Sequence, residues 1–323
     1  MTTTRFAPSP TGYLHLGHAH SALFAYDQAA GGSFLLRHED IDPGRCRPEF
    51  IAAIEEDLGW LGLSWPQPVR RQSQHMADYA QALTKLEEMG LLYPCFCTRT
   101  DISREIEQSG HAPHGPDGPL YPGICRGLAR DERPHALRLD MAKAVAMAGP
   151  LRWYDRAEGW QDAQPQLFGD VVLARKDTPT SYHLAVTVDD ALQGVTLVTR
   201  GVDLFAASHL HRLLQALLGL PVPEWHHHRL LTDDHGKRFA KRDKSLTLRA
   251  LRESGKTPDE VYFHRFPANR RPRIEPRPAW PRGSPCALPH ALVAGQPGAR
   301  FNVGLERLGG HAHLPIVRLQ RAA

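Results

Sequence analysis

Apolar residues in the first 92 positions follow two spacings that alternate along the chain. Short apolar runs in TRFAPSPTG and SFLLRHED predict a strand that leads into a glycine-punctuated loop, and then a second, buried strand. Other stretches place apolar residues three and four positions apart, as amphipathic helices do. The alternation of strand and helix predicts a parallel α/β sheet with helices on its faces. The expected helices span residues 18–30, 47–63 and 75–90.

The pattern changes between residues 93 and 165. Glycine and proline crowd residues 109–123, which argues against a long regular element there. Alternation returns at 135–141 and 169–201 and predicts strands, and residues 208–220 have helical periodicity. We therefore expect a Rossmann-type α/β domain with an insertion. Its parts are a first half (1–92), an inserted subdomain (93–165), a second half (166–241), a short helical region (242–266) and a Pro- and Arg-rich, poorly ordered tail (267–323).

The composition is that of a globular protein without a strong electrostatic signature. Hydrophobic residues make up 41% of the chain, charged residues 23%, and the formal net charge is +4. This mild basic excess is compatible with nucleic-acid binding but does not indicate it. The N-terminus lacks the basic-then-apolar pattern of a signal peptide, and no run of about 18 apolar residues occurs. We expect a cytoplasmic protein that does not contact a membrane.

Residues 5–22, RFAPSPTGYLHLGHAHSA, concentrate prolines, glycines and histidines where a strand passes into a helix. Glycine lets the backbone approach a ligand, and a helix start offers unpaired N–H groups to phosphate. His15 and His18 can donate hydrogen bonds to phosphate oxygens from there. The alternative interpretation is a Pro/Gly turn with incidental surface histidines.

The same stretch resembles the HIGH motif of class I aminoacyl-tRNA synthetases, written here His15-Leu16-Gly17-His18, and RFAPSPTG resembles their glutamyl/glutaminyl branch. GKRFAKRDKS, residues 236–245, stands where that family carries its KMSKS loop. In that block Lys241 is kept and Ala240 replaces the serine. RHEDID, residues 37–42, and SYHLAVTVDDALQGVTLVTRGVDL, residues 181–204, resemble further family blocks. A charged strand-end loop and an amphipathic strand pair are their bland alternatives.

The resemblance implies the class I fold, a Rossmann-type parallel sheet with an inserted zinc-binding subdomain and a short helical C-terminal region. It also implies that the carboxylate of L-glutamate attacks the α-phosphate of ATP, which Mg²⁺ accompanies. The residues implied for ATP binding are His15, Gly17, His18 and Lys241, and the catalytic ones are His15, His18 and Lys241.

A glutamate substrate carries two carboxylates and one ammonium, so its pocket requires guanidinium and acidic groups. Arg5 and Arg200 are the expected carboxylate clamps because arginine pairs bidentately with carboxylates. Glu39 is expected to take the ammonium. The sequence does not assign each carboxylate to one arginine, and a surface salt bridge is the alternative for Arg200. The full set expected to bind glutamate is Arg5, Ala7, Ser9, Glu39, Tyr182 and Arg200.

Three cysteines of the insertion, Cys95, Cys97 and Cys125, are candidate ligands of one structural Zn²⁺, which requires four. His111 or His114 could be the fourth ligand, and three unrelated free thiols are the alternative. Cys-x-Cys followed by Tyr-x₃-Cys is similar to the zinc site of glutamyl-Q tRNA(Asp) synthetases, and this resemblance implies Tyr121. We expect Cys46 and Cys286 to remain thiols. The run of histidines at 226–228 is interpreted as structural, since neighbours on a strand face opposite ways.

Only residues 243–323 follow Arg242, the last of the five positions aligned with KMSKS, and these are too few for an anticodon-reading helical domain. In this the chain resembles the glutamyl-Q family, which transfers glutamate to queuosine in the anticodon loop of tRNA(Asp). The expected partners are therefore ATP, L-glutamate and queuosine-containing tRNA(Asp). The alternatives are a conventional glutamyl-tRNA synthetase fragment that charges a 3′ end, a non-catalytic synthetase paralogue, and a generic nucleotidyl transferase.

Overall fold

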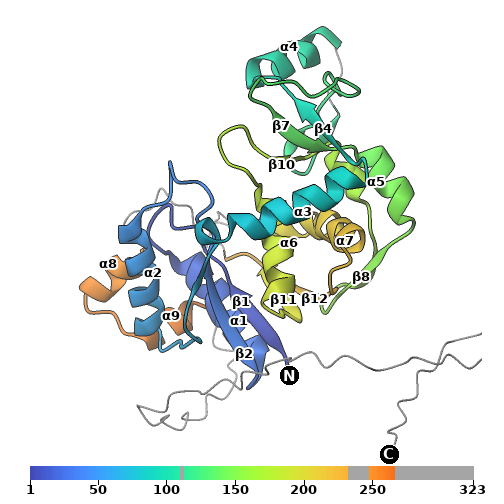
Figure 1. Ribbon diagram of the computed structural model, residues 1–323. Helices are drawn as coiled ribbons and strands as arrows, with labels where there is room; N and C mark the ends of the chain where they lie inside the picture. Colours follow the sequence, from blue (N-terminus) through green and yellow to red (C-terminus); the bar gives the residue numbers. More distant parts are fainter. Residues whose placement is uncertain (110–112, 232–246, 266–323) are drawn as a thin grey trace, which may run out of the picture. The chain divides into compact units, whose positions relative to one another are not determined.

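The computed structural model describes residues 1–109, 113–231 and 247–265 (Figure 1). Its first part alternates strands and helices as expected, and the first helix begins at Leu16, two positions before the expected His18. The elements are β1 (Thr3–Phe6), α1 (Leu16–Ala29), β2 (Ser33–His38), α2 (Pro48–Trp60), β3 (Arg70–Arg71), the 3₁₀ turn η1 (Gln72–Gln74) and α3 (Met76–Glu88).

Parallel pairing dominates the α/β part. β1 pairs in parallel with β2, and β2 with β3. β11 (Leu197–Gly201) pairs in parallel with β12 (Glu224–His228), which in turn meets β8 (Arg152–Asp155) in parallel. The N–H of Thr196 donates to the carbonyl of Thr3 at 3.0 Å, so β11 begins beside β1. The expectation of a parallel sheet is confirmed for these strands, while β8 and β9 (Gly159–Asp162) form an antiparallel hairpin.

The middle of the chain forms a smaller antiparallel sheet. β7 (Ala136–Leu139) pairs with β4 (Leu92–Cys95) on one side and with β10 (Val172–Ala174) on the other. Over residues 113–123, the part of the Gly/Pro-rich stretch that follows the gap in the description, the elements are the two-residue strands β5 (His114–Gly115) and β6 (Gly118–Pro119). The remaining elements here are α4 (Arg99–Ser109), α5 (Met141–Ala148) and the 3₁₀ turn η2 (Pro165–Phe168).

The expectation of strands throughout residues 169–201 is wrong for α6, a helix at Tyr182–Leu192. The Ser181 hydroxyl caps it by accepting from the N–H of Leu184 at 3.4 Å. Every side chain from Leu184 to Asp190 is buried. A helix enclosed on all sides has no polar stripe, so its sequence lacks the periodicity of an amphipathic helix.

Two apolar clusters hold the fold together. One joins α3, α5, α6 and α7 (Ala207–Leu218), the last preceded by the 3₁₀ turn η3 (Val202–Leu204). The other joins α1 and α2 to β1 and β2, and it includes Leu248 from α8 (Leu248–Glu253) and Val261 from α9 (Pro258–Arg265). Figure 1 shows α8 and α9 beside α2 and α1. Among the described helices, none combines the length and the apolar character of a membrane-spanning segment.

Candidate functional site

The HLGH stretch forms the first turn of α1, and both of its histidines belong to the cap. Nδ1 of His15 accepts from the N–H of Gly17 at 3.1 Å, and the N–H of His15 donates to Nδ1 of His18 at 3.2 Å. The two ring centroids are 3.8 Å apart. A Cβ atom on Gly17 would lie 2.9 Å from Cε1 of His15, so glycine is required for this ring position. The turn thus presents two imidazoles at a helix N-terminus, where anions bind favourably.

The chain on either side of residues 232–246 contacts this same helix. Thr247 forms an antiparallel bridge with His15, and the N–H of Leu248 donates to the carbonyl of Leu14 at 2.8 Å. On the other side, the His228 ring lies 4.6 Å from the ring of His20 in α1. Lys241 itself lies outside the described residues, six positions before Thr247.

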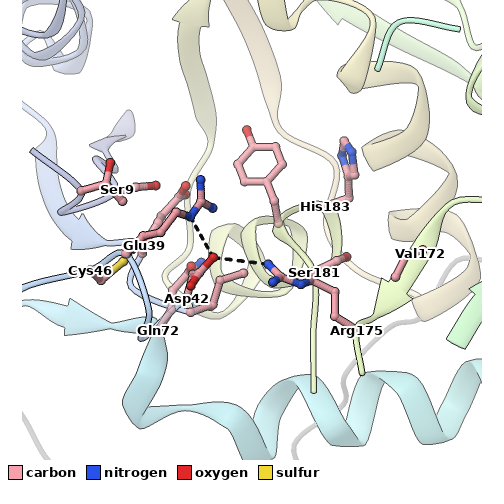
Figure 2. A pocket seen from close by; sticks show the side chains of 13 residues that line it. Ser9, Glu39, Asp42, Cys46, Gln72, Val172, Arg175, Ser181 and His183 are labelled. Atoms are coloured by element: carbon pink, nitrogen blue, oxygen red, sulfur yellow. Dashed lines mark hydrogen bonds and ion pairs between the residues drawn. The ribbon is translucent and has the colours of Figure 1, made fainter. Parts of the chain in front are cut away.

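A cavity of about 320 Å³ opens beyond the carboxyl ends of β1 and β2. This is the edge where the sequence predicts a ligand site, as in other open parallel sheets. Figure 2 shows Ser9 and Glu39 on one side and His183 and Val172 on the other, with the pair Asp42–Arg175 between them. The lining residues are Ser9, Thr11, Glu39, Ile41, Asp42, Arg45, Cys46, Gln72, Val172, Arg175, Ser181, Tyr182 and His183.

Three of the six residues expected to bind glutamate line this cavity. Ser9, Glu39 and Tyr182 line it directly. The two arginines are buried and do not line the cavity, but their charges act on Tyr182, which does. They are neighbours, because Nη1 of Arg5 donates to the carbonyl of Thr199 at 3.0 Å, next to Arg200 in β11. Ala7 is half-buried in the loop that leads from β1 to Ser9.

Arg5 is already held by a carboxylate within a buried ionic network. Its Nε donates to Oδ1 of Asp190 at 2.9 Å, and Nη1 of Arg37 donates to the same oxygen at 2.8 Å. Nη2 of Arg37 also donates to Oε1 of Glu39 at 3.3 Å. Burial raises the pKa of Glu39, and the charges of Arg37 and Arg5 oppose that rise. For Asp190, burial also favours the neutral form, yet the two arginines together lower its pKa.

Asp189, the neighbour of Asp190 in α6, binds three side chains, one of which lines the cavity. Its carboxylate accepts from Nε of Arg70 at 2.7 Å, from Nε2 of Gln72 at 2.8 Å and from the Tyr79 hydroxyl at 3.0 Å. Gln72 in turn lines the cavity. Neither aspartate is among the residues predicted from the sequence, although a consecutive acidic pair within an apolar run, VTVDDAL, is a signal that could have indicated them.

Within the part of the chain that the structure describes, the hydrogen-bond partners of Arg200 are neutral. Its Nη2 donates to the Ser208 hydroxyl at 2.6 Å, its Nε to Nε2 of His227 at 3.2 Å, and its Nη1 lies 3.2 Å from Nδ1 of His211. Among the described residues, no carboxylate forms an ion pair with Arg200, in contrast to Arg5. Burial lowers the pKa of Arg200, and the nearby Tyr182 phenol partly opposes this.

The three cysteines of the insertion converge with Tyr121. Their Sγ atoms all lie within 4.8 Å of one another, with Cys97 and Cys125 at 3.4 Å. The Tyr121 hydroxyl is 3.5 Å from Sγ of Cys95 and 3.5 Å from Sγ of Cys97. Ligands of a tetrahedral zinc ion with bonds of about 2.3 Å lie about 3.8 Å from one another, so these four groups fit around one metal ion.

Hydrogen bonds prepare one thiol of this group for ionisation. Burial alone would raise the pKa of Cys125. Hydrogen bonds to its thiol from the Tyr121 side chain and from the backbone N–H of Phe96 lower that pKa to about 7. Burial raises the pKa of Cys97 to about 11. The hydroxyl of Tyr121 also accepts from the N–H of Cys125 at 2.9 Å.

The other histidines considered as ligands are placed differently. His114 is exposed in β5 and is not part of the cysteine group, and His111 lies outside the described residues, as does Cys286. Cys46 lines the cavity as a free thiol. The histidines of β12 belong to no metal-ligand group among the described residues, and His227 contacts Arg200 instead.

Comparison with known proteins gives a consistent result. The family model "tRNA synthetases class I (E and Q), catalytic domain" matches residues 1–264. A glutamyl-Q tRNA(Asp) synthetase of Rhodobacter capsulatus is 50% identical over 80% of this chain and 97% of its own, and one of Deinococcus radiodurans is 44% identical over 81% and 87%. A glutamate tRNA ligase of Elizabethkingia meningosepticum, solved in complex with its amino acid, superposes with a TM-score of 0.60 at 28% identity, over 75% of this chain and 52% of the ligase. The chain therefore belongs to the class I tRNA synthetases for glutamate and glutamine, and within them to the glutamyl-Q tRNA(Asp) synthetases.

Proposed function

We propose that the chain activates L-glutamate with ATP and transfers the glutamyl group to queuosine in the anticodon loop of tRNA(Asp). The observation that carries the activation step is the buried guanidinium of Arg200, which has no carboxylate partner among the described residues and lies next to Tyr182 of the cavity. The helix start with two imidazoles supports a nucleotide site. The relatives named as glutamyl-Q tRNA(Asp) synthetases, which the chain matches over most of its length, support the choice of acceptor.

The nucleotide belongs at the first turn of α1. The N-terminal N–H groups of the helix and the imidazoles of His15 and His18 can donate to the triphosphate. Gly17 leaves room for the ring of His15 beside the helix start. Lys241, which the KMSKS resemblance implies for ATP binding, would add a cation during attack on the α-phosphate. Mg²⁺ would arrive with ATP as part of the substrate.

The amino acid belongs in the cavity, with its side-chain carboxylate on Arg200. The α-carboxylate must stay free to attack phosphorus, so the buried guanidinium is better suited to the other carboxylate. Glu39 would hold the ammonium group, and Arg5 would add positive charge beside Arg200. Ser9 and Tyr182 would add hydroxyl contacts, and Ala7 would add a backbone contact, in the loop that borders the cavity.

The acyl transfer step requires a nucleophile from the tRNA. A hydroxyl of the queuosine cyclopentenediol attacks the carbonyl carbon of glutamyl-adenylate, and a new ester C–O bond forms. The bond between that carbon and the phosphate oxygen breaks, AMP leaves, and the hydroxyl proton passes to solvent. Activation and transfer together thus convert glutamate, ATP and tRNA into glutamylated tRNA, AMP and pyrophosphate.

One structural Zn²⁺ would be held by Cys95, Cys97, Tyr121 and Cys125. The spacing of the four ligand atoms and the lowered pKa of Cys125 support this set. When bound, the ion would join the end of β4 to the segment 121–125, and so stabilise a part of the chain with little apolar core of its own.

A transfer assay with labelled glutamate tests the proposal. The protein is incubated with ATP and tRNA(Asp) with or without queuosine, or with tRNA(Glu), and nuclease digestion then separates the anticodon fragment from the 3′-terminal adenosine. We expect label in the anticodon fragment of queuosine-containing tRNA(Asp) alone. Label on the 3′ adenosine of tRNA(Glu) would instead identify a conventional glutamyl-tRNA synthetase.

A further inference from the structure

Two histidines behind the cavity, His211 in α7 and His227 in β12, hold the guanidinium of Arg200. We propose that they are positioning residues, which accept hydrogen bonds from Arg200 as neutral imidazoles and thereby set the affinity for the carboxylate side chain of the substrate. The inference rests on the proposed function and goes beyond it, because neither histidine lines the cavity.

The two ring nitrogens of His211 have different hydrogen-bond partners, which determine which of them donates and which accepts. Arg200 can only donate, so Nδ1 of His211, at 3.2 Å from its Nη1, must accept. Nε2 of His211 then carries the proton and donates to Nδ1 of His183 at 3.1 Å. Nε2 of His183 donates in turn to Oδ2 of Asp117 at 3.2 Å. Arg200 can only donate and the Asp117 carboxylate can only accept, so this series of hydrogen bonds fixes the tautomer of each histidine between them. His211 is therefore neutral, with its proton on Nε2.

His227 repeats this arrangement from another element. Its Nε2 accepts from Nε of Arg200 at 3.2 Å, and its Nδ1 then donates to Oδ2 of Asp155 at 2.6 Å. The backbone N–H of His227 donates to the same oxygen at 3.1 Å, so both the backbone and the ring of His227 are bound to Asp155 in β8. Ser208 completes the set by accepting from Nη2 of Arg200 at 2.6 Å. The guanidinium is thus oriented from both α7 and β12.

The surroundings of the two imidazoles favour the neutral forms. Burial lowers the pKa of His211, and the facing groups Arg200, His183, Arg5 and His227 lower it further. Burial and Arg200 also lower the pKa of His227 to about 4, while Asp155 opposes that change. A protonated imidazole would present an N–H to Arg200, which has no acceptor, so the hold on the guanidinium requires neutral rings.

Neutral partners orient a cation without cancelling its charge. Arg5, by contrast, shares the carboxylate of Asp190 with Arg37. Arg200 therefore keeps a full positive charge in a buried place, and a substrate carboxylate that pairs with it gains more than an uncharged carboxamide does. If the imidazole acceptors are lost, the guanidinium of Arg200 is free to change its orientation, and the affinity for glutamate is lowered.

Glutamate-dependent ATP–pyrophosphate exchange by the full chain measures this effect. His211→Leu removes the acceptor, and His211→Asn keeps one near the position of Nδ1. For His211→Leu we expect the KM for glutamate to rise about tenfold or more, since a hydrogen bond to a charged group is lost. The KM for ATP should stay within about twofold, and His211→Asn should recover much of the glutamate affinity.

A matched control lies two residues away on the same helix. His209 is also buried, and its Nδ1 accepts from Nε1 of Trp153 at 3.0 Å, without contact to Arg200. His209→Leu should lower the melting temperature as much as His211→Leu does, yet leave the KM for glutamate unchanged. If His211→Leu does not fold, His227→Phe and the acceptor-retaining His227→Gln replace the pair in the same assay.

The outcomes separate the inference from the function on which it rests. If the unaltered protein shows no glutamate-dependent exchange, the proposed function is wrong and the inference falls with it. If that protein is active but His211→Leu keeps its KM for glutamate, the positioning role is wrong and the function stands. The same holds if the KM values for glutamate and ATP rise equally, or if His209→Leu raises the KM for glutamate as well.

Discussion

At the scale of single residues, two buried arginines of the same site differ in what holds them. Arg5 is paired with Asp190, while Arg200 is held by a hydroxyl and two imidazoles. A buried cation without an anionic partner is costly unless a ligand supplies one. The unpaired charge therefore supports the proposal that Arg200 recognises the carboxylate of the substrate.

Replacement of Arg200 by glutamine should accordingly abolish most glutamate activation. We expect kcat/KM for glutamate in pyrophosphate exchange to fall about a hundredfold or more, because a buried charged contact is worth about 2–5 kcal/mol. The KM for ATP should change little. Arg152→Gln, at an exposed arginine of β8, is the control. A loss of less than about threefold for Arg200→Gln would show that another group holds the carboxylate.

The neutral histidines also predict how stability depends on pH. The pKa of His227 is about 4 in the folded protein, lowered by burial and by Arg200 from an ordinary value of 6.5. Between these values the unfolded chain binds a proton that the folded chain does not, so the free energy of unfolding falls as the pH is lowered. Urea unfolding between about pH 7.5 and 4.5 should show this loss.

The variant His227→Phe provides the comparison for this measurement. It removes the group that must be protonated on unfolding, so its free energy of unfolding should decline less steeply over the same pH interval. Equal declines in the two proteins would show that His227 does not contribute to the acid sensitivity of the fold.

At the scale of elements, the first turn of α1 combines two functions in one short stretch. It begins the helix, and it fixes the rings of His15 and His18. The sequence predicts this turn from local signals alone, namely a helix start with glycine between two histidines. The hydrogen bonds of this turn join residues two and three positions apart, so the prediction needed no knowledge of distant contacts.

Gly17→Ala tests the second of these functions. The new methyl group would lie 2.9 Å from Cε1 of His15, so the ring must move, while alanine itself favours the helix. We expect the melting temperature to be unchanged or higher and kcat/KM for ATP in exchange to fall about ten- to a hundredfold. Unchanged exchange kinetics would remove His15 from the nucleotide site.

The cysteine group is the other element-scale feature that local signals indicate. We expect the purified protein to contain about one zinc ion per chain, and a Cys95→Ser, Cys97→Ser double variant to contain none. Its melting temperature should drop, because metal binding contributes to the stability of this region. Cys46→Ser is the matched control, at a cysteine outside the group. Stoichiometric zinc in the double variant would contradict the assignment.

α6 shows where local signals fail. Its residues have a pattern that resembles strands. Packing against α3 and α7 accounts for a helix in a segment with three consecutive β-branched residues, Val186 to Val188. The same burial hid the role of Asp189 and Asp190, whose partners lie more than a hundred positions away. Propensity is a weak guide where tertiary packing decides.

At the scale of the whole molecule, residues far apart in the chain meet at one cavity. Short motifs at the end of a strand or the start of a helix predicted that Ser9, Glu39 and Tyr182 share one pocket, and these residues line the cavity. The same motifs predicted that Arg5 and Arg200 lie near each other, as they do. The groups that orient Arg200 come from α7 and β12, and no motif marks them. Their positions follow from the packing of the second half of the domain.

The identity of the tRNA product tests the central claim most directly. Queuosine-containing tRNA(Asp) is incubated with the protein, ATP and glutamate, digested to nucleosides, and analysed by mass spectrometry. The account predicts a queuosine nucleoside that carries one glutamyl group and that is absent when ATP is omitted. Unmodified queuosine together with glutamyl-adenosine from the 3′ end would contradict it.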